Sequence, residues 1–417
     1  MAQISDLPEE TLLHIFRFLL TSDLYNTVKL VCQKWNRICD DSVLYSRVII
    51  DGKIERFSAV EILKKYPDQL RHIIFEERSD LNLLLGYVTR CVNLQSLKLI
   101  SCYGQVRNII NLNNEVNVKL IWKVLLKCPS LSSLEIRQTA FKNGLRNFCP
   151  ANANLHKLRI KSDNNMEIVE PKLEQMFGLK DLRLQGIKLY DDRALIRVCS
   201  NNQHSLTVLK LDVWKFDESC QDELMKCIGR CTKLTKLSLE NFSASGITDE
   251  GFAHLSNLKR LKTLVVTNAK KVSARAIMRL FYEPHVQNFE KLNLGRCPEL
   301  HQLVLKFVAD QCPNLKKLYL DQFALTCRCI GVYDIQYIGE NCPLIEHLEL
   351  NSMDPVVGEA IPTVLKNYPN LKSFRYFVRP LKDYFSEYDP IIRRSKQELP
   401  NFYITCSLKH GIIGYKK

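Results

Sequence analysis

The residues that most often carry out catalysis occur in this sequence without the spacing that catalysis needs. The nine histidines are scattered, with no HExxH motif and no close His/Cys pairing, and neither a GxxxxGK[ST] nor a GxGxxG loop is present to bind phosphates. His156 and His347 fall within predicted strands, where a solvent-facing or core position is the simpler interpretation. The sequence therefore indicates a binding protein with no enzymatic activity and no cofactor.

Sixteen cysteines could bind zinc or form disulfides, but their spacing favours neither. No CxxC pair occurs, and the CxC at Cys327 and Cys329 has no second pair to complete a four-ligand site. We therefore expect reduced thiols and no bound metal. Five cysteines share one position, three residues before the start of a repeated apolar pattern, which suits small buried side chains. They are Cys91, Cys128, Cys231, Cys312 and Cys342.

Positive charge is the remaining feature that could bind a partner. The net charge is +14, and residues 1–50 contain five Lys or Arg against six Asp or Glu, so residues 51–417 carry +15. Such an excess favours acidic or phosphorylated proteins, RNA or membrane surfaces, although a surplus spread over a large surface also aids solubility. The candidate substrate-binding cations lie on three consecutive predicted strands: Lys157, Arg159, Lys161, Arg183 and Lys210. A solvated basic face without a ligand is the competing interpretation.

A repeated pattern of apolar residues predicts the elements that position these cations. Apolar residues at offsets zero, three and five recur in thirteen copies, from Tyr45/Val48/Ile50 to Leu371/Phe374/Tyr376, mostly 24 to 28 residues apart. This period is typical of leucine-rich repeats, in which a strand alternates with a helix. The sequence resembles that family, and the resemblance implies an α/β horseshoe solenoid. Side chains alternate along a strand, so the residues between the apolar positions should lie on the concave face.

Two irregularities interrupt the pattern. The interval from Leu99 to Ile136 is 37 residues, and the excess, Tyr103 to Val118, is predicted to be a surface insertion. The second irregularity is the ninth position of each repeat, where this repeat type usually has Asn or Cys. Only Cys102 and Cys297 conform. We therefore expect packing to replace most of the usual side-chain ladder.

The segment before the repeats has more apolar surface than about 40 residues can bury alone. Its first predicted helix is apolar almost all round, whereas a surface helix of a self-contained domain needs only one apolar stripe. The second stripe is therefore available to a partner. The segment resembles the F-box in its Leu7-Pro8-Glu9-Glu10 opening, the hydrophobic run to Leu19, Leu24, the Val31-Cys32 pair followed by Trp35, and the Leu44-Tyr45 close. Many F-boxes end with Trp where this chain has Tyr45.

The resemblance to the F-box family implies a three-helix module that docks on the Skp linker protein and, through it, on the cullin of a Skp–cullin–F-box ubiquitin ligase. The Cys-Pro-x-Leu sequence before the strands, as at Cys128 and Cys312, is also characteristic of leucine-rich repeats in F-box proteins. The linker-binding face is expected to include some of the following residues, with the others in the small core: Leu7, Pro8, Ile15, Phe16, Leu19, Leu24, Val31 and Trp35.

We therefore predict an F-box at residues 1–46, about 12–13 leucine-rich repeats at residues 47–377 and a C-terminal cap or tail at residues 378–417. The predicted function is substrate recognition for a ubiquitin ligase, with an acidic or phosphorylated protein on the concave face. The alternative is a repeat protein that acts independently of ubiquitin and binds nucleic acid or an acidic scaffold. Of these two ligands, we favour nucleic acid less. No basic leader or membrane-length apolar run is present, so we expect a cytoplasmic or nuclear protein without membrane contact.

Overall fold

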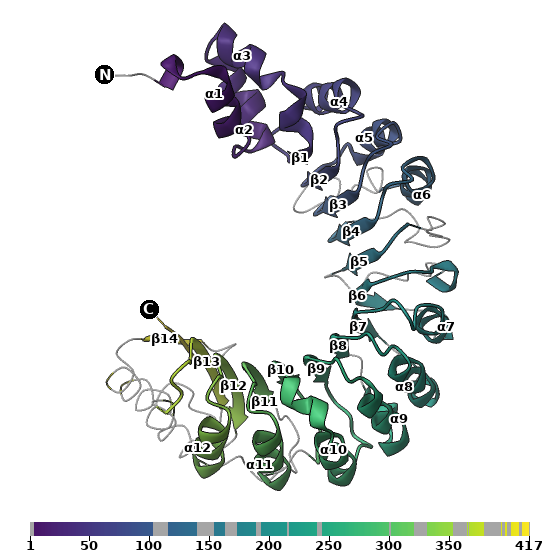
Figure 1. The fold of residues 1–417 in the computed structure, drawn as a ribbon, viewed down its shortest axis with the longest axis vertical. Helices are drawn as coiled ribbons and strands as arrows, with labels where there is room; N and C mark the ends of the chain where they lie inside the picture. The colour runs from purple at the N-terminus through teal and green to yellow at the C-terminus, as the bar shows by residue number, and fades with distance from the viewer. Residues whose placement is uncertain are drawn as a thin grey trace. The chain divides into compact units, whose positions relative to one another are not determined.

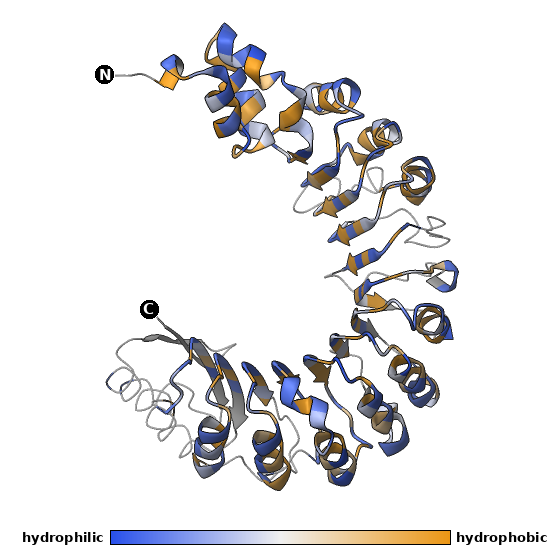
Figure 2. Cartoon of the chain, viewed as in Figure 1, coloured by the Kyte–Doolittle hydropathy of each residue, from blue (hydrophilic) through white to orange (hydrophobic). Residues whose placement is uncertain are grey.

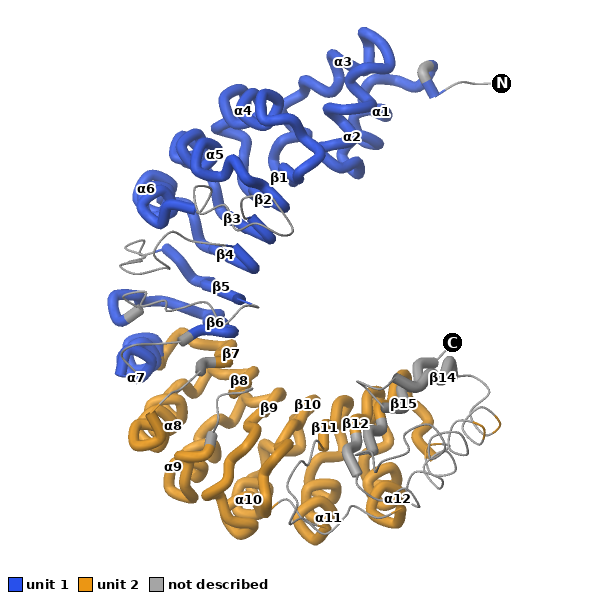
Figure 3. Tube along the Cα trace, turned by 180° about the vertical axis from the view of Figure 1, so that it is seen from behind, with its two compact units in different colours: residues 1–202 blue, residues 203–417 orange. Residues whose placement is uncertain are grey.

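The computed structural model describes residues 4–102, 116–139, 154–162, 173–188, 193–214, 217–239, 244–299, 302–320, 332–352, 365, 367–378, 393, 397, 402–407 and 411–416. Most of the predicted Tyr103–Val118 insertion lies outside these residues, as do Cys327 and Cys329. The chain forms two compact units, residues 1–202 and residues 203–417 (Figure 3). The division falls within the repeats, and the two units are described separately.

The first unit begins with three short helices and continues as strands that alternate with helices (Figure 1). Within the described residues of this unit, six strands are parallel, and each pairs with the next one along the chain from β1 to β6. The helices are α1 (Glu9–Phe16), α2 (Thr21–Asn26), α3 (Gln33–Cys39), α4 (Arg56–Lys65), α5 (Leu81–Val88), α6 (Val118–Lys127) and α7 (Arg193–Asn201). The strands are β1 (Arg47–Ile50), β2 (His72–Glu76), β3 (Ser96–Ile100), β4 (Ser133–Arg137), β5 (Lys157–Lys161) and β6 (Asp181–Lys188).

The second unit continues the alternation and ends in an antiparallel pair of strands. Strands β7 to β13 are parallel in chain order, β15 pairs antiparallel with β13, and β14 pairs with β15. The helices are α8 (Gln221–Gly229), α9 (Asp249–Ala253), α10 (Ala274–Phe281), α11 (Gln302–Gln311) and α12 (Val332–Asn341). The strands are β7 (Val208–Trp214), β8 (Lys236–Leu239), β9 (Thr263–Val266), β10 (Lys291–Asn293), β11 (Lys317–Leu320), β12 (His347–Ser352), β13 (Ser373–Val378), β14 (Phe402–Ser407) and β15 (Gly411–Lys416).

The apolar triplets form the core between the strands and the helices. Ile73, Leu97, Leu134 and Leu158 align across β2 to β5, and all four are fully buried. Helices cover one side of the strands, and we call the other side the open face (Figure 1). Hydrophobic and hydrophilic residues alternate along the strands in Figure 2, as a sheet buried on one side requires. The predicted α/β repeat fold is therefore confirmed.

Side-chain hydrogen bonds between repeats are more extensive than the sequence predicts. At the ninth repeat position, the Cys102 thiol donates to the Phe75 carbonyl (3.5 Å), and Cys297 donates to Val266 in the same way (3.7 Å). Thr139 occupies the equivalent position after β4, and its hydroxyl donates to the Leu99 carbonyl (3.4 Å). A hydroxyl can replace the thiol because both are small donors beside the same carbonyl.

Side chains also connect the starts of successive helices in the second unit. The Asp222 carboxylate in the first turn of α8 accepts hydrogen bonds from the Thr248 backbone N–H (2.9 Å) and hydroxyl (2.6 Å), and Thr248 caps α9. Asp249 accepts the same two bonds from Ser273 (both 2.7 Å), which caps α10. Each cap is therefore fixed by a carboxylate from the preceding repeat.

The five cysteines in phase with the repeats are buried, as their spacing predicts. Cys91, Cys128, Cys231, Cys312 and Cys342 each have no exposed surface. Burial raises the pKa of the Cys91, Cys231 and Cys342 thiols to about 12 and that of the Cys128 thiol to about 11. The thiolate form is therefore strongly disfavoured in the folded chain.

These thiols should react much more slowly than the exposed Cys32. At pH 8, a thiol with a pKa near 12 is a thiolate in about one molecule in ten thousand, and the thiolate is the nucleophile. We expect N-ethylmaleimide to modify Cys32 at least about 100-fold faster than the five repeat cysteines. Mass spectrometry of timed digests gives the rates, with denatured protein as the control in which the difference disappears. Similar native rates at Cys91 and Cys32 would show that the repeats open readily.

Candidate functional site

The three N-terminal helices form a small core of their own. The buried side chains of Leu12 and Phe16 lie on one side of α1, and the Phe16 ring meets the Trp35 ring of α3 edge to face, with centroids 5.3 Å apart. The Lys34 ammonium group donates to the Leu7 carbonyl oxygen (2.8 Å), which fixes the chain before α1 to α3. Contacts at Leu7 and at Phe16 therefore hold α1 and the residues before it against α3.

The structure separates the eight predicted linker-binding residues into core and surface. Phe16 and Leu24 are buried within the helical core, so neither can contact a partner while the domain is folded. They are apolar because α1 and α2 pack inward at these positions. Leu7, Ile15 and Trp35 are half-buried. The exposed members of the set are Pro8, Leu19 and Val31.

Three exposed apolar side chains in the turns of this segment, those of Phe18, Leu20 and Leu30, are absent from the predicted set. Phe18 and Leu20 lie in the turn between α1 and α2, with 78% and 49% of their surface exposed. Leu30, the last residue of the 3-10 turn Val28–Leu30, is 75% exposed, and Val31, which follows it, is 55% exposed. The sequence has no periodic pattern that distinguishes the buried apolar residues of this segment from the exposed ones. We call Phe18, Leu20, Leu30 and Val31 the exposed apolar set.

An aromatic stack joins the N-terminal helices to the first repeat. The Tyr45 ring lies parallel to the Tyr66 ring at the end of α4, with centroids 3.9 Å apart and an interplanar angle of 6°. Tyr45 is fully buried, and its hydroxyl donates to the Cys39 carbonyl oxygen (2.6 Å). The Tyr66 hydroxyl donates to the Asp40 carbonyl oxygen (3.2 Å). The helical segment and the first repeat therefore share one core.

Charged side chains border this stack. The Asp40 carboxylate lies 3.0 Å from the Lys29 ammonium group, within the same segment, and 3.0 Å from the Lys65 ammonium group of α4. Burial alone would raise the pKa of the Asp40 carboxyl, but hydrogen bonds from Lys65 and Lys29 lower it below its ordinary value. Asp40 is therefore charged at neutral pH and links the two parts of the first unit.

Four of the five predicted substrate-binding cations lie on adjacent strands of the open face. Lys157, Arg159 and Lys161 alternate with buried residues along β5, and Arg183 pairs in register with Arg159 on β6. Lys210 belongs to the second unit, where it lies on β7. The structure therefore brings the first four together, whereas Lys210 belongs to the other unit.

Two further cations of this face lie on the preceding strands. Lys98 of β3 and Arg137 of β4 are on the open face, and both form ion pairs with Glu135 of β4. Neither belongs to the predicted set, which is confined to the three consecutive repeats from Lys157 to Lys210. The cationic strand face is defined by Lys98, Arg137, Lys157, Arg159, Lys161 and Arg183.

Two carboxylates partly neutralise the cationic strand face. Asp181 accepts hydrogen bonds from both arginines, at 2.6 Å from Arg159 Nη2 and 2.8 Å from Arg183 Nε. Glu135 is 1% exposed; burial alone would raise the pKa of its carboxyl, but the hydrogen bond and charge of Arg137, with the charge of Lys98, lower it. Burial and the neighbouring Arg159 lower the pKa of the Lys157 ammonium group. On the described strands β3 to β6, the face therefore carries six cations against two carboxylates.

The six cations of this face give it the chemistry to bind anions. No three His, Cys, Asp or Glu side chains come together as a metal site within the described ranges. In the same ranges, no helix is both long enough and apolar enough to cross a bilayer. The exposed apolar set and the cationic strand face are two candidate binding surfaces of the first unit.

Comparison with known proteins relates the N-terminal segment to one family. A family model described as F-box-like matches residues 4–51, which include the three helices and β1. F-box/LRR-repeat protein 21 of Arabidopsis thaliana is 27% identical over 162 residues, which cover 38% of this chain and 50% of that protein. The chain thus spans half the length of that relative.

Two solved structures are similar to this chain at low identity. The chain of the yeast Rad7 and Elc1 complex has 18% identity and a TM-score of 0.43, with 82% of this chain and 88% of that chain covered. An internalin (inlF) of Listeria monocytogenes has 14% identity and a TM-score of 0.44, with coverage of 86% and 94%.

Proposed function

We propose that this chain, which carries an F-box-like domain at its N terminus followed by leucine-rich repeats, is the substrate-recognition subunit of a Skp–cullin–F-box ubiquitin ligase. It would act as a non-catalytic adaptor in the cytoplasm or nucleus. The F-box-like domain would bind the Skp linker protein, and the open face of the repeats would hold the substrate. The F-box would comprise residues 1–46, the leucine-rich repeats residues 47–377, and the C-terminal cap or tail residues 378–417.

The observation that best supports this proposal is the exposed apolar set within the F-box-like domain. Phe18, Leu20, Leu30 and Val31 are each about half exposed or more, although the domain has a buried core that these residues do not join. Large apolar side chains left exposed in the turns of so small a domain favour a surface that a partner covers. Burying them against an apolar groove of the linker would supply binding free energy without changing the domain core.

Affinity capture of the tagged full chain from cells tests the proposal. We expect the Skp linker protein and a cullin to copurify with it, because the F-box-like domain would bind the linker and the linker would bind the cullin. The alternative, a ubiquitin-independent repeat protein that binds nucleic acid or an acidic scaffold, has no need of either partner. Capture of an acidic scaffold or nucleic acid with no linker protein would favour that alternative.

We further propose that the cationic strand face binds an acidic or phosphorylated segment of the substrate. Arg159 and Arg183 lie side by side with their guanidinium groups directed to one carboxylate, Asp181. This carboxylate orients both side chains, and their remaining N–H donors can bind a second anion in bidentate fashion. The contact should weaken as salt is added, because these groups are not fully buried.

Replacing Arg159 and Arg183 together with Ala should reduce substrate capture by about tenfold or more. Alanine is preferable to a charge reversal, because two glutamates beside Asp181 would place three carboxylates together. The measurement is proximity labelling by the full chain in cells treated with a proteasome inhibitor. Proteins labelled by the wild-type chain should be lost from the double variant, while labelling of the Skp linker is unchanged.

The matched control is Lys262→Ala with Lys372→Ala. These residues of the second unit also form ion pairs with carboxylates, Glu290 and Glu346, at 3.0 Å and 2.9 Å. This variant loses the same number of charges away from the cationic strand face and should keep the substrates. If the arginine double variant labels the same proteins as this control, the substrate does not bind at the cationic strand face.

A further inference from the structure

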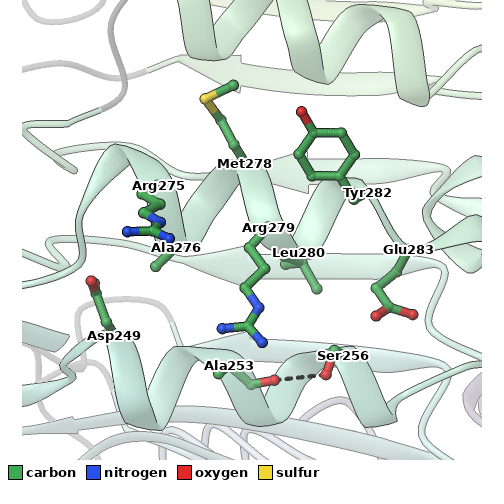
Figure 4. Close-up of a pocket in the computed structure, with 10 residues that line it drawn as sticks. All are labelled: Asp249, Ala253, Ser256, Arg275, Ala276, Met278, Arg279, Leu280, Tyr282 and Glu283. Carbon is green, nitrogen blue, oxygen red and sulfur yellow. Dashed lines mark hydrogen bonds between the residues drawn. The ribbon is translucent and has the colours of Figure 1, made fainter.

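A groove separates the helices of two neighbouring repeats in the second unit. It lies between α10 on one side and α9 with the following 3-10 turn, His254–Asn257, on the other, and its volume is about 960 Å³. This size is at the upper end of the range of ligand-binding pockets. Figure 4 shows the residues that line it. None of them belongs to the surfaces described above.

Small side chains keep the groove open. Ala253 at the end of α9 and Ala276 in α10 lie within it, and neither has atoms beyond Cβ that could fill the space between the helices. Leu280 of α10 is buried beside them. The Ser256 hydroxyl donates to the Ala253 carbonyl oxygen (2.8 Å), which keeps this hydroxyl on its own helix (Figure 4). A ligand would therefore meet an apolar floor.

Two arginines border this floor without a carboxylate of their own. Arg275 and Arg279 are exposed residues of α10, and within the described residues neither forms an ion pair or a hydrogen bond. Arg279 extends from α10 toward Ala253 and Ser256 (Figure 4). Residues four apart on a helix are separated by about 6 Å along its axis, so the two guanidinium groups can reach neighbouring anions.

The acids of the groove have other partners. Asp249 accepts two hydrogen bonds from Ser273, the cap of α10. The Glu283 carboxylate lies 2.6 Å from the Lys259 ammonium group, whose hydrogen bond lowers the pKa of this carboxyl, and the charge of Arg279 contributes less. The first turn of α10 contains no acidic residue of its own, and the Asp249 carboxylate occupies the positive end of the helix dipole through the Ser273 cap.

We infer that this groove binds an acidic segment of a partner protein, with two carboxylates about one helical turn apart held by Arg275 and Arg279. Each guanidinium can bind a carboxylate through two parallel hydrogen bonds, and the alanine floor can accept an apolar side chain between the two acids. The groove belongs to the second unit and the linker-binding and cationic surfaces to the first. The inference therefore does not depend on the function proposed above.

Selection from a display library of short random peptides, with the full chain as bait, tests the inference. We expect enrichment of peptides with two acidic residues three or four positions apart. Their affinity should fall about tenfold or more for Arg275→Ala with Arg279→Ala, and also for Ala253→Trp, which fills the groove without a change of charge. The control is Lys226→Ala with Arg230→Ala, an equally spaced and exposed pair at the end of α8.

The control variant should bind the selected peptides as the wild-type chain does. Equal losses in the control and in the arginine variant would mean that overall charge attracts the peptides, and this would overturn the inference. So would a library that gives no acidic peptide whose binding depends on Arg275, Arg279 and the space above Ala253.

Discussion

Replacing Leu30 and Val31 with Asp is expected to weaken binding of the Skp linker protein by about a hundredfold or more while the chain stays folded. Both side chains are mostly exposed in the free protein, with 75% and 55% of their surface accessible, so the substitutions remove little from the core. Their effect should therefore appear in the complex and hardly at all in the stability of the chain.

The magnitude follows from what each side chain loses at an interface. Full burial of a Leu or Val contributes about 1.5–3 kcal/mol, and an unpaired carboxylate in an apolar contact adds a further penalty. A loss of about 3–6 kcal/mol for the pair corresponds to two to four powers of ten in affinity. Titration calorimetry with purified linker protein measures it.

The matched control replaces Leu126 of α6 and Leu303 of α11 with Asp. These leucines are similarly exposed, at 53% and 69%, but belong to repeats. Linker affinity should equal that of the wild-type chain. If Leu30→Asp with Val31→Asp binds the linker normally, the exposed apolar set is not the contact surface, and the half-buried residues Leu7 and Ile15 become the next candidates.

Replacing Tyr45 with Ala should lower the free energy of unfolding of the first unit by about 3–5 kcal/mol. The ring is fully buried and stacked on Tyr66, so its removal leaves a cavity between the F-box-like domain and α4. The Cys39 carbonyl oxygen also loses the Tyr45 hydroxyl as its donor. Chemical denaturation followed by circular dichroism gives the change.

Two variants separate the causes of this loss. Tyr45→Phe keeps the ring and should cost only about 1 kcal/mol, the net value of one hydrogen bond. Tyr333→Ala removes a ring that is 82% exposed on α12 and should change stability by less than about 0.5 kcal/mol. A small effect of Tyr45→Ala would contradict the conclusion that the stack forms a core shared by the F-box-like domain and the first repeat.

The repeat core could be predicted from the sequence because its signal is local. Strand residues alternate between the two sides of a sheet, so the apolar triplets identified Ile73, Leu97, Leu134 and Leu158 as core and placed Arg159 on the opposite side. Parallel repeats of similar length then put equivalent residues side by side. The register of Arg159 with Arg183 follows from that regularity.

The details of each surface depend on contacts that cross between repeats, and periodicity does not contain them. The use of Asp181 by both Arg159 and Arg183 requires side-chain directions on two strands. In the F-box-like domain, Phe16 and Phe18 both belong to one apolar run, yet the first is buried and the second exposed. The α9–α10 groove exists because Ala253 and Ala276, from different repeats, face the same space.

The most direct test of the proposed function is a titration of purified Skp linker protein into the purified full chain. We expect a complex of one linker per chain with a Kd of about 1 µM or lower, and a negative change in heat capacity because apolar side chains are buried. No measurable binding by the folded full chain at linker concentrations up to about 100 µM would contradict the assignment of this protein to a Skp–cullin–F-box ubiquitin ligase.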